Sequence, residues 1–269
     1  MSTLNLLLTH LPADDVDGQL RLLRAVAPGS RFAVCHGGDR SAFEGVAEVD
    51  KAFVDDPSLR GAARSFQSYD VTLSVVHAHW LVREPSIDAV YLFEFDHLVL
   101  RADFETALRD LAARTGADLL GKNAAVRTGT NWHHYTRFRR DETLLAHLRR
   151  VSVRDDPTRM FGLVACALWL SRAAIESYVA VGAHPPCYGE LYVPTLVHHL
   201  GYRVVDVDAV SDLYKHVRWT PEHDAAEAEA LRRAGVTFVH PVKDGTARAS
   251  VLARAAGATG PKPAAASQA

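Results

Sequence analysis

Two carboxylates follow the strongest strand signal in the chain. Residues 88–100 read DAVYLFEFDHLVL, so Glu94 and Asp96 come directly after an apolar run. Alternate residues of a strand point to the same side, and we therefore expect both carboxylates on one side of the strand end. Two such charges repel each other unless a cation or water separates them. A hard divalent cation, Mg²⁺ or Mn²⁺, that bridges to a diphosphate would satisfy both; acids that are solvated or paired with arginines are the alternative.

A third carboxylate opens a late helix. In the stretch AHPPCYGELYVPTLVHHLGY, Pro185, Pro186 and Gly189 constrain a loop, and Glu190 begins the helix predicted for residues 190–200. The helix dipole favours an acid in the first turn, which is the purely structural interpretation. A carboxylate within reach of a hydroxyl can also take its proton as a general base.

Polar and aromatic side chains gather in two further places. Residues 236–244 read VTFVHPVKD, which predicts a short strand that presents His240, ends at Pro241 and is followed by Lys243. A lone histidine at a strand end is usually structural. Residues 121–138 form a predicted loop with aromatic rings that can stack on sugars and amides and imidazoles that can bind hydroxyls. Its candidates are Asn131, Trp132, His133, His134 and Tyr135.

The elements that must position these residues alternate between strand and helix. Strands are predicted at residues 4–9, 31–38 and 88–100, with a helix at 16–26 after the first, and the alternation continues to a strand at 236–240. This order predicts an α/β domain with a mostly parallel central sheet and helices on both faces. In such sheets ligands bind beyond the carboxyl ends of the strands. We expect a single domain over residues 1–245 and a low-complexity, disordered tail over 246–269.

The bulk composition excludes several classes of protein. The chain has 269 residues, a formal net charge of −2 and a sequence pI near 6.7, so no overall field attracts nucleic acid or an anionic membrane. Its 3 cysteines show no CxxC pairing, which is typical of a reducing compartment. The first residues read as a strand rather than a signal peptide, and no apolar run is long enough for a membrane helix. These features predict a cytoplasmic protein without a transmembrane segment.

With the triplet Glu94-Phe95-Asp96 after a mid-chain apolar strand, the chain resembles the GT-A class of nucleotide-sugar glycosyltransferases, which carry a D-x-D or similar triplet there. Asp96 matches the last acid of that triplet, and Glu94 departs from its first. The stretch GELYVPTL is similar to the helix start of inverting, branching-type glycosyltransferases, which carries their base. The resemblance covers residues 1 to about 244 in architecture, and its specific motifs cover about 20 residues.

This resemblance implies a Rossmann-like GT-A domain that moves a sugar from a nucleoside diphosphate, UDP above all, to a hydroxyl of a sugar, small-molecule or glycan acceptor. It implies a hexosyl- or N-acetylhexosaminyltransferase with Mn²⁺ or Mg²⁺ at Glu94, Asp96 and His240. Lys243 would neutralise the β-phosphate, and Glu190 would be the base of an inverting reaction.

For the nucleotide, the resemblance implies Thr9 and His10 at the end of the first strand. Gln67, with Arg64 and Tyr69, is a further candidate for contact with uracil or phosphate. A retaining reaction and a metal-independent site stay open.

Other classes fit less well. A nucleotidyltransferase should have a Gly-rich, basic phosphate loop after the first strand, whereas THLPADDVDG is acidic there. A non-catalytic nucleotide- or sugar-binding protein of the same fold is a second alternative. No GxGxxG follows a strand, as a Rossmann dehydrogenase would need, and no GxSxG elbow for hydrolysis is present.

Overall fold

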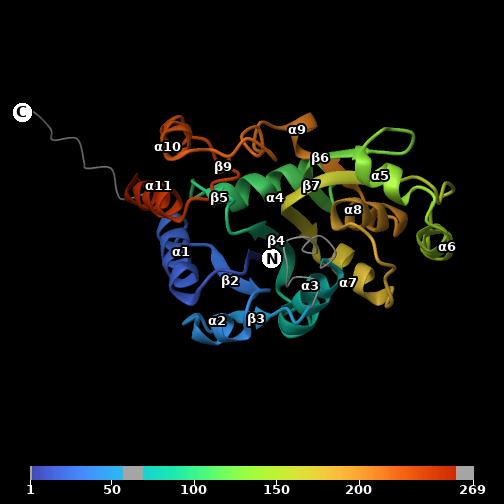
Figure 1. The fold of residues 1–269 in the computed structure, drawn as a ribbon, viewed down its shortest axis with the longest axis horizontal. Helices are drawn as coiled ribbons and strands as arrows, with labels where there is room; N and C mark the ends of the chain where they lie inside the picture. The colour runs from blue at the N-terminus through green and yellow to red at the C-terminus, as the bar shows by residue number, and fades with distance from the viewer. Residues whose placement is uncertain (1, 57–68, 259–269) are drawn as a thin grey trace, which may run out of the picture.

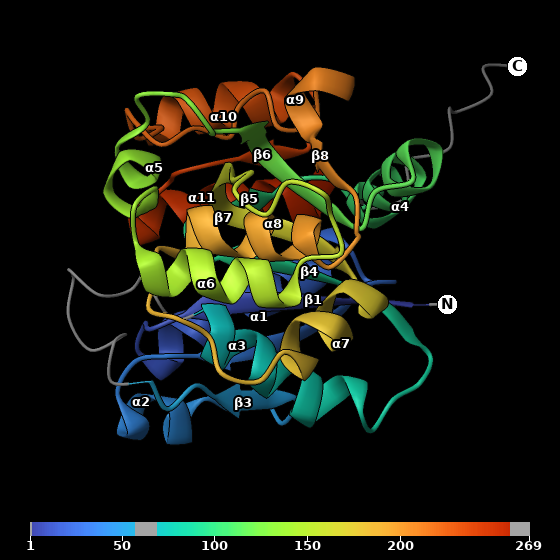
Figure 2. The same cartoon turned by 90° about the vertical axis from the view of Figure 1, so that its right-hand side faces the viewer.

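The computed structural model describes residues 2–56 and 69–258, and a seven-stranded sheet runs through its centre (Figures 1 and 2). The strand order is β3-β2-β1-β4-β7-β6-β8. All neighbours pair in parallel except those that β7 makes with β4 and β6. The predicted mostly parallel sheet is therefore confirmed. The strands are β1 (Ser2–Thr9), β2 (Arg31–His36), β3 (Lys51–Phe53), β4 (Ile87–Glu94), β6 (Leu119–Val126), β7 (Phe161–Ser171) and β8 (Val204–Asp206).

Helices cover both faces of this sheet, as predicted. Along β1, Leu4 and Leu6 face one apolar core and Leu7 faces the other, because side chains alternate along a strand. One core includes α3 (Tyr69–Val76), α6 (Glu142–Val151), α7 (Arg172–Ala180) and α8 (Gly189–His199). The opposite core includes α1 (Ala13–Val26), α4 (Phe104–Thr115), α10 (Ala225–Arg233) and α11 (Gly245–Ala258). The remaining helical segments are α2 (Arg40–Gly45), the π-helical η3 (His77–Leu81), α5 (His133–Phe138) and α9 (Val207–Val210).

The order of the strands reverses at β1. From β1 the chain adds β2 and then β3 on one side, and it returns to place β4 on the other side of β1. The carboxyl ends of β1 and β4 therefore lie next to each other at a topological switch point, where open α/β sheets bind their ligands.

A second, two-stranded sheet joins distant parts of the chain. β5 (Leu98–Val99) pairs antiparallel with β9 (Phe238–Val239), with Leu98 opposite Val239. The backbone N–H of Val242 also donates to the carbonyl of Asp96 at 2.9 Å. This pairing holds the segment after β9 against the turn that follows β4.

The expectation of disorder from residue 246 is wrong for residues 246–258, which form most of α11. Its apolar side chains recur at helical spacing, and Ala247, Val251, Leu252 and Ala255 are buried against the core that contains α1. Figure 1 shows α11 and α1 side by side. The segment is rich in alanine, which has the highest helix propensity of all residues, so low complexity here accompanies a helix.

Within the described ranges, no helix combines the length and the apolar character needed to cross a bilayer.

Candidate functional site

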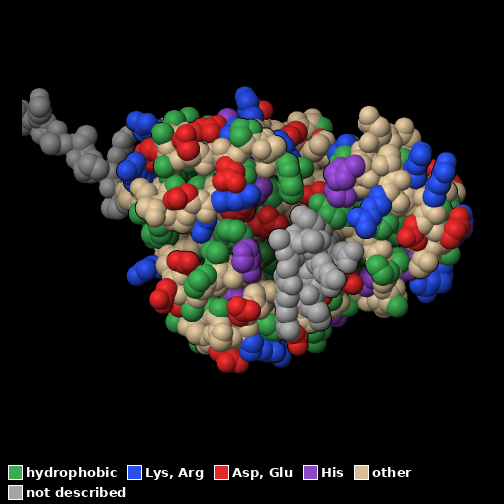
Figure 3. All heavy atoms as spheres, viewed as in Figure 1, with side chains coloured by type: hydrophobic (Ala, Val, Ile, Leu, Met, Phe, Trp, Pro, Cys, Tyr) green, Lys and Arg blue, Asp and Glu red, His purple; other side chains and the backbone are tan. Residues whose placement is uncertain are grey.

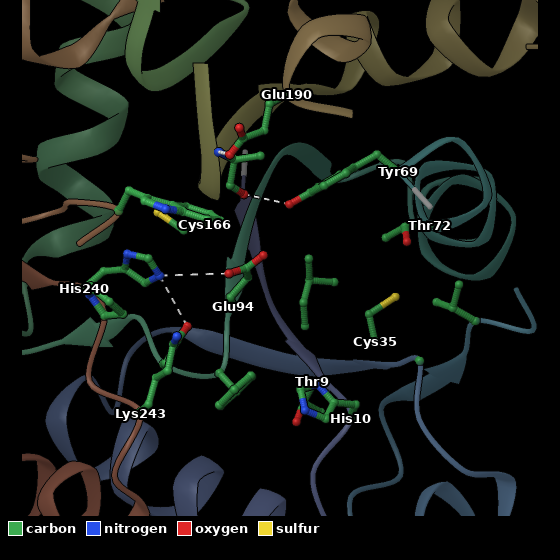
Figure 4. A pocket seen from close by; sticks show the side chains of 18 of the residues that line it. Thr9, His10, Cys35, Tyr69, Thr72, Glu94, Cys166, Glu190, His240 and Lys243 are labelled. Atoms are coloured by element: carbon green, nitrogen blue, oxygen red, sulfur yellow. Dashed lines mark hydrogen bonds and ion pairs between the residues drawn. The ribbon is translucent and has the colours of Figure 1, made fainter. Parts of the chain in front are cut away.

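A cavity of about 450 Å³ opens at the carboxyl ends of β1, β2 and β4. Acidic side chains show beside the hollow near the centre of the face in Figure 3, and Figure 4 gives a closer view. The cavity therefore lies where the switch point predicts a ligand. Its lining includes Thr9, His10, Cys35, Tyr69, Glu94, Asp96, Cys166, Glu190, Trp219, Glu222, His240 and Lys243.

Glu94, Asp96 and His240 form one cluster in this cavity. One ligand atom of each lies within 4.8 Å of the other two. His240 Nε2 is 3.3 Å from Asp96 Oδ1. It is 3.9 Å from Glu94 Oε2 (Figure 4). Glu94 ends β4, Asp96 lies in the turn before β5, and His240 follows β9. The β5–β9 pairing is thus what brings the histidine to the two acids.

The orientation of His240 leaves one ring nitrogen available to a ligand. Its Nδ1 lies 2.8 Å from the carbonyl oxygen of Arg218, and its backbone N–H donates to the carbonyl of His216. A carbonyl can only accept, so Nδ1 carries the hydrogen and Nε2 faces the carboxylates. A metal-binding histidine is commonly held in this way.

Without a cation the cluster retains protons. Burial raises the pKa of the Glu94 carboxyl, and the charge of Asp96 adds to this, to about 7. Burial alone would lower the pKa of His240, but the neighbouring Cys166 and Asp96 outweigh it and raise that pKa to about 11. The imidazolium then supplies the positive charge between the acids.

The donor set fits a hard divalent cation. Asp96 Oδ1 is buried and, apart from the ion pair with His240, has no hydrogen-bond partner among the residues that the structure describes. Two carboxylates and an imidazole suit Mg²⁺ or Mn²⁺, and a bound cation would satisfy the orphaned oxygen.

Lys243 lies at the rim of the same cavity. Its Nζ forms an ion pair with Glu222 at 3.1 Å, with more than half of each side chain exposed. Arg248 of α11, which is buried, donates to the carbonyl oxygens of Val242 and Lys243 and so holds the loop that carries the lysine. The phosphate of a ligand could therefore replace the Glu222 carboxylate as the partner of Lys243.

Glu190 lies in the first turn of α8 and faces the cavity from the side opposite Thr9 and His10 (Figure 4). Its Oε1 accepts from the backbone N–H of Ala165 in β7 at 3.0 Å, and the hydroxyl of Tyr188 also donates to the carboxylate. Burial raises the pKa of Glu190, while these two hydrogen bonds oppose the rise. Glu190 is therefore held by two hydrogen bonds in addition to the helix dipole, and these bonds fix its orientation.

A second cavity, of about 680 Å³, begins at Glu190. Glu190 and Trp219 line both cavities, so they mark the junction between the two. Its other described lining residues are Asn123, Arg127, Trp132, His133, His134, Arg137, Phe138, Leu163, Val164 and Tyr188. Three members of the predicted acceptor loop, Trp132, His133 and His134, are among them. Tyr135 instead packs in the core.

At the other end of the first cavity, the structure brings Thr9 and His10 to the lining, as expected for residues at the end of β1. Thr9 Oγ1 accepts from the backbone N–H of Leu11, and the His10 ring meets Phe95 edge-on at 4.9 Å. Tyr69 donates to the carbonyl of Ala165 at 2.7 Å, so its hydroxyl is committed within the fold. The candidates Gln67 and Arg64 lie outside the described residues.

Several lining residues carry no signal in the sequence. Trp219 is 62 % exposed, and it reaches the site because Val217 pairs with His240 in an isolated bridge. Cys166 reaches the site from β7, and Arg127 and Arg137 lie within the predicted acceptor loop, on either side of its aromatic candidates. Only the tertiary contacts of these residues bring them to the site, so local pattern alone could not find them.

Comparison with known proteins gives no match to a family model and none to a curated protein sequence. Among solved structures, the fold is similar to a glycosyltransferase involved in glycosylation of the major capsid of PBCV-1 (8 % identity, 94 % of this chain and 98 % of that one, TM-score 0.44). It is also similar to a mannosyltransferase from Pyrobaculum calidifontis in complex with GDP-Man and Mn²⁺ (13 %, 98 % and 77 %, TM-score 0.43). A third is mouse xyloside xylosyltransferase 1 (11 %, 77 % and 85 %, TM-score 0.38).

Proposed function

We propose that the protein is a GT-A-type glycosyltransferase, which moves a hexosyl or N-acetylhexosaminyl group from a nucleoside diphosphate sugar to an acceptor hydroxyl. The observation that carries this proposal is the position of Glu190 between two cavities. One cavity holds the cluster of Glu94, Asp96 and His240 at the switch point of the sheet, and the other is lined by aromatic and polar side chains. An inverting transferase needs two adjoining sites and a base where they meet.

In the first cavity, Glu94, Asp96 and His240 would hold Mn²⁺ or Mg²⁺. When bound, that cation supplies positive charge to the diphosphate. Lys243 would leave Glu222 and donate to the β-phosphate, which stabilises the charge of the leaving group. Thr9 and His10, at the far end, would contact the ribose and the base, and UDP is the nucleotide that we propose first.

At the junction, Glu190 would accept the proton of the acceptor hydroxyl as that oxygen attacks the sugar. A base on the acceptor side corresponds to direct displacement, so we propose inversion at the anomeric carbon. The donors from Ala165 and Tyr188 keep the carboxylate oriented before the acceptor arrives. The cytoplasmic location expected from the sequence stays a prediction.

The test is calorimetric titration with UDP in the presence and absence of Mn²⁺ and of Mg²⁺. We expect a divalent cation to strengthen UDP binding, and we expect Asp96→Asn to reduce that gain at least about tenfold, since it removes one charged ligand. Asp110→Asn, at an exposed acid of α4, is the matched control and should bind as the natural protein does.

If UDP fails to bind with or without a cation, the donor assignment is wrong. If Asp96→Asn leaves the cation's contribution unchanged, the cluster does not hold the metal.

A further inference from the structure

The second cavity is lined by two arginines and one acid. Arg127 and Arg137 line it together with His133 and His134, and Glu190 at the junction is the only acid among its described lining residues. Within residues 2–56 and 69–258, no carboxylate forms an ion pair with either arginine; their nearest ring contacts are Trp132 for Arg127 and Phe138 for Arg137. Histidine and basic side chains also lie near one another in the region of α5 in Figure 3. Glu190 and Asp206 act electrostatically on Arg127, but neither forms an ion pair with it, so both arginines keep a guanidinium that can pair with a ligand anion.

Arg127, which directly follows β6, is held in place by the fold. Arg127 is half-buried, its Nη2 donates to the carbonyl of Asn123 at 2.9 Å, and its guanidinium carbon lies 4.9 Å from the centre of the Trp132 ring. Its Nε is buried and has no hydrogen-bond partner among the described residues. Such a group is positioned before any ligand binds, and several of its N–H donors are still unused.

The backbone near Arg127 is shaped so that its guanidinium can lie beside Trp132. Asn123 has φ of +54°, a left-handed conformation that is uncommon for a residue other than glycine. The β6–β7 register shifts before it, between residues 121 and 122, and again across it, between residues 122 and 125. Opposite, a Cβ on Gly162 would lie 2.4 Å from Trp132 and 2.8 Å from Arg127. The absence of a side chain at Gly162 therefore leaves room for both.

His134 adds a neutral hydrogen-bonding group to the cavity rather than charge. Its ring stacks on Tyr188 with 3.4 Å between centres and 14° between planes. Burial lowers the pKa of His134, and the positive charges of His133 and Arg137 lower it further, to about 4. A neutral imidazole can bind a hydroxyl, while the arginines supply the fixed charge.

We propose that this second cavity binds an acceptor that carries an oxyanion, a carboxylate or a phosphate, which Arg127 and Arg137 hold while its sugar ring packs against Trp132. This inference rests on the proposed function, because it takes the cavity beside Glu190 as the acceptor site. It adds the substrate class: an anionic glycan or sugar phosphate in place of a neutral one. Arginine forms paired, charge-assisted hydrogen bonds with carboxylates and with phosphates, so either anion would explain why Arg127 and Arg137 line the same cavity.

The experiment measures binding of three probes to the full chain without donor: methyl glucoside, methyl glucuronide and glucose phosphate. We expect at least one anionic probe to bind at least about tenfold more tightly than the neutral glucoside. That is the gain in affinity expected from one good charge-assisted hydrogen bond. The double variant Arg127→Gln with Arg137→Gln should abolish that preference. Arg140→Gln, at an exposed arginine two residues after α5, is the matched control and should retain it.

Preference for the glucuronide identifies a carboxylate, and preference for the phosphate identifies a phosphate. Equal or absent binding of charged and neutral probes overturns the proposal, as does a preference that survives the double variant. UDP affinity is measured on the same samples, and its loss in the double variant would also overturn the proposal, since it would assign the arginines to the donor. If UDP binds no variant while the anion preference holds, sugar transfer is wrong and the anion site stands.

Discussion

A single carboxylate, Glu190, connects the two halves of the proposed reaction. It receives hydrogen bonds from Ala165 and Tyr188, yet it lies in surroundings dry enough to raise its pKa. Hydrogen bonds to the charged form and burial act in opposite directions. The result suits a base: the group is oriented by its donors and keeps an affinity for a proton above that of an exposed glutamate.

The pH dependence of transfer should report this balance. A base works only when ionised, so kcat/KM at saturating cation should fall on the acid side through the pKa of Glu190. Because burial raises that pKa, the fall should occur above 4.5, the ordinary value. Tyr188→Phe removes a donor that stabilises the carboxylate, and the acid limb should move to still higher pH.

Glu190→Gln should lower transfer about 10²- to 10⁴-fold and leave UDP affinity near that of the natural protein. Anomeric configuration of the product, read by NMR, is the companion measurement, and we expect inversion. Transfer that survives Glu190→Gln, or a product with retained configuration, would remove Glu190 from the role of base.

At this scale the sequence predicts some residues and not others. Glu94 and Asp96 can be recognised because a buried strand and the acids that end it are contiguous. Glu190 can be recognised because a loop with two prolines precedes it. The contact of His240 with Asp96, in contrast, requires the β5–β9 pairing, and residues 98–99 and 238–239 are too short to predict their partner. Arg127 needs Gly162 opposite it, and no local pattern marks that approach.

At the scale of elements, β6 and β7 both pair in the central sheet and both contribute residues to the second cavity. Residues 119–121 of β6 pair regularly with residues 168–170 of β7, whereas the register shifts between residues 121 and 125. Asn123 in this irregular stretch and Arg127 just after β6 line the second cavity. Irregular pairing of this kind re-aims side chains near functional sites. Strand and helix alternation predicted the regular parts, since apolar periodicity follows burial. It could not predict the irregular end of β6, where Ala124 alone of residues 122–126 is buried.

Gly162→Ala tests whether this strand end shapes the acceptor site. A methyl group there would lie 2.4 Å from the Trp132 ring, and real Cβ contacts are essentially never that short, so Trp132 must move. We expect a loss of stability of about 1–3 kcal/mol and a clear rise in the KM for acceptor. UDP affinity should stay unchanged, because Gly162 does not line the first cavity.

Gly182→Ala is no suitable control, since φ is +81° there, but Gly29→Ala meets no atom within 4 Å and has no such strain. Both acceptor KM and stability should be close to natural in Gly29→Ala. An unchanged acceptor KM in Gly162→Ala would show that the Trp132 position does not matter for the acceptor.

Across the whole molecule, segments distant in sequence meet at the switch point. Glu94 and Asp96 come from the middle of the chain, and His240 and Lys243 from near its end. α11, which follows directly, packs on α1 and sends Arg248 back to hold the loop of Lys243. The composition of residues 246–269 predicted disorder because it lacks aromatic residues, but small apolar side chains at helical spacing suffice when a neighbouring helix covers them.

α11 should therefore support both stability and the site. Leu252 is fully buried, and Leu252→Ala should lower the free energy of unfolding by about 2–5 kcal/mol, measured by denaturant titration. Ala253→Ser, on the exposed side of the same helix, should change it by less than about 0.5 kcal/mol.

A chain that ends after Asp244 loses Arg248 as well, so its cation-dependent UDP affinity should fall even at temperatures where it stays folded. A chain that ends after Ala258 keeps every described contact of α11 and should match the natural protein in both measurements. If the chain cut after Asp244 binds UDP as tightly as the natural one, Arg248 has no part in placing Lys243, and α11 serves stability alone.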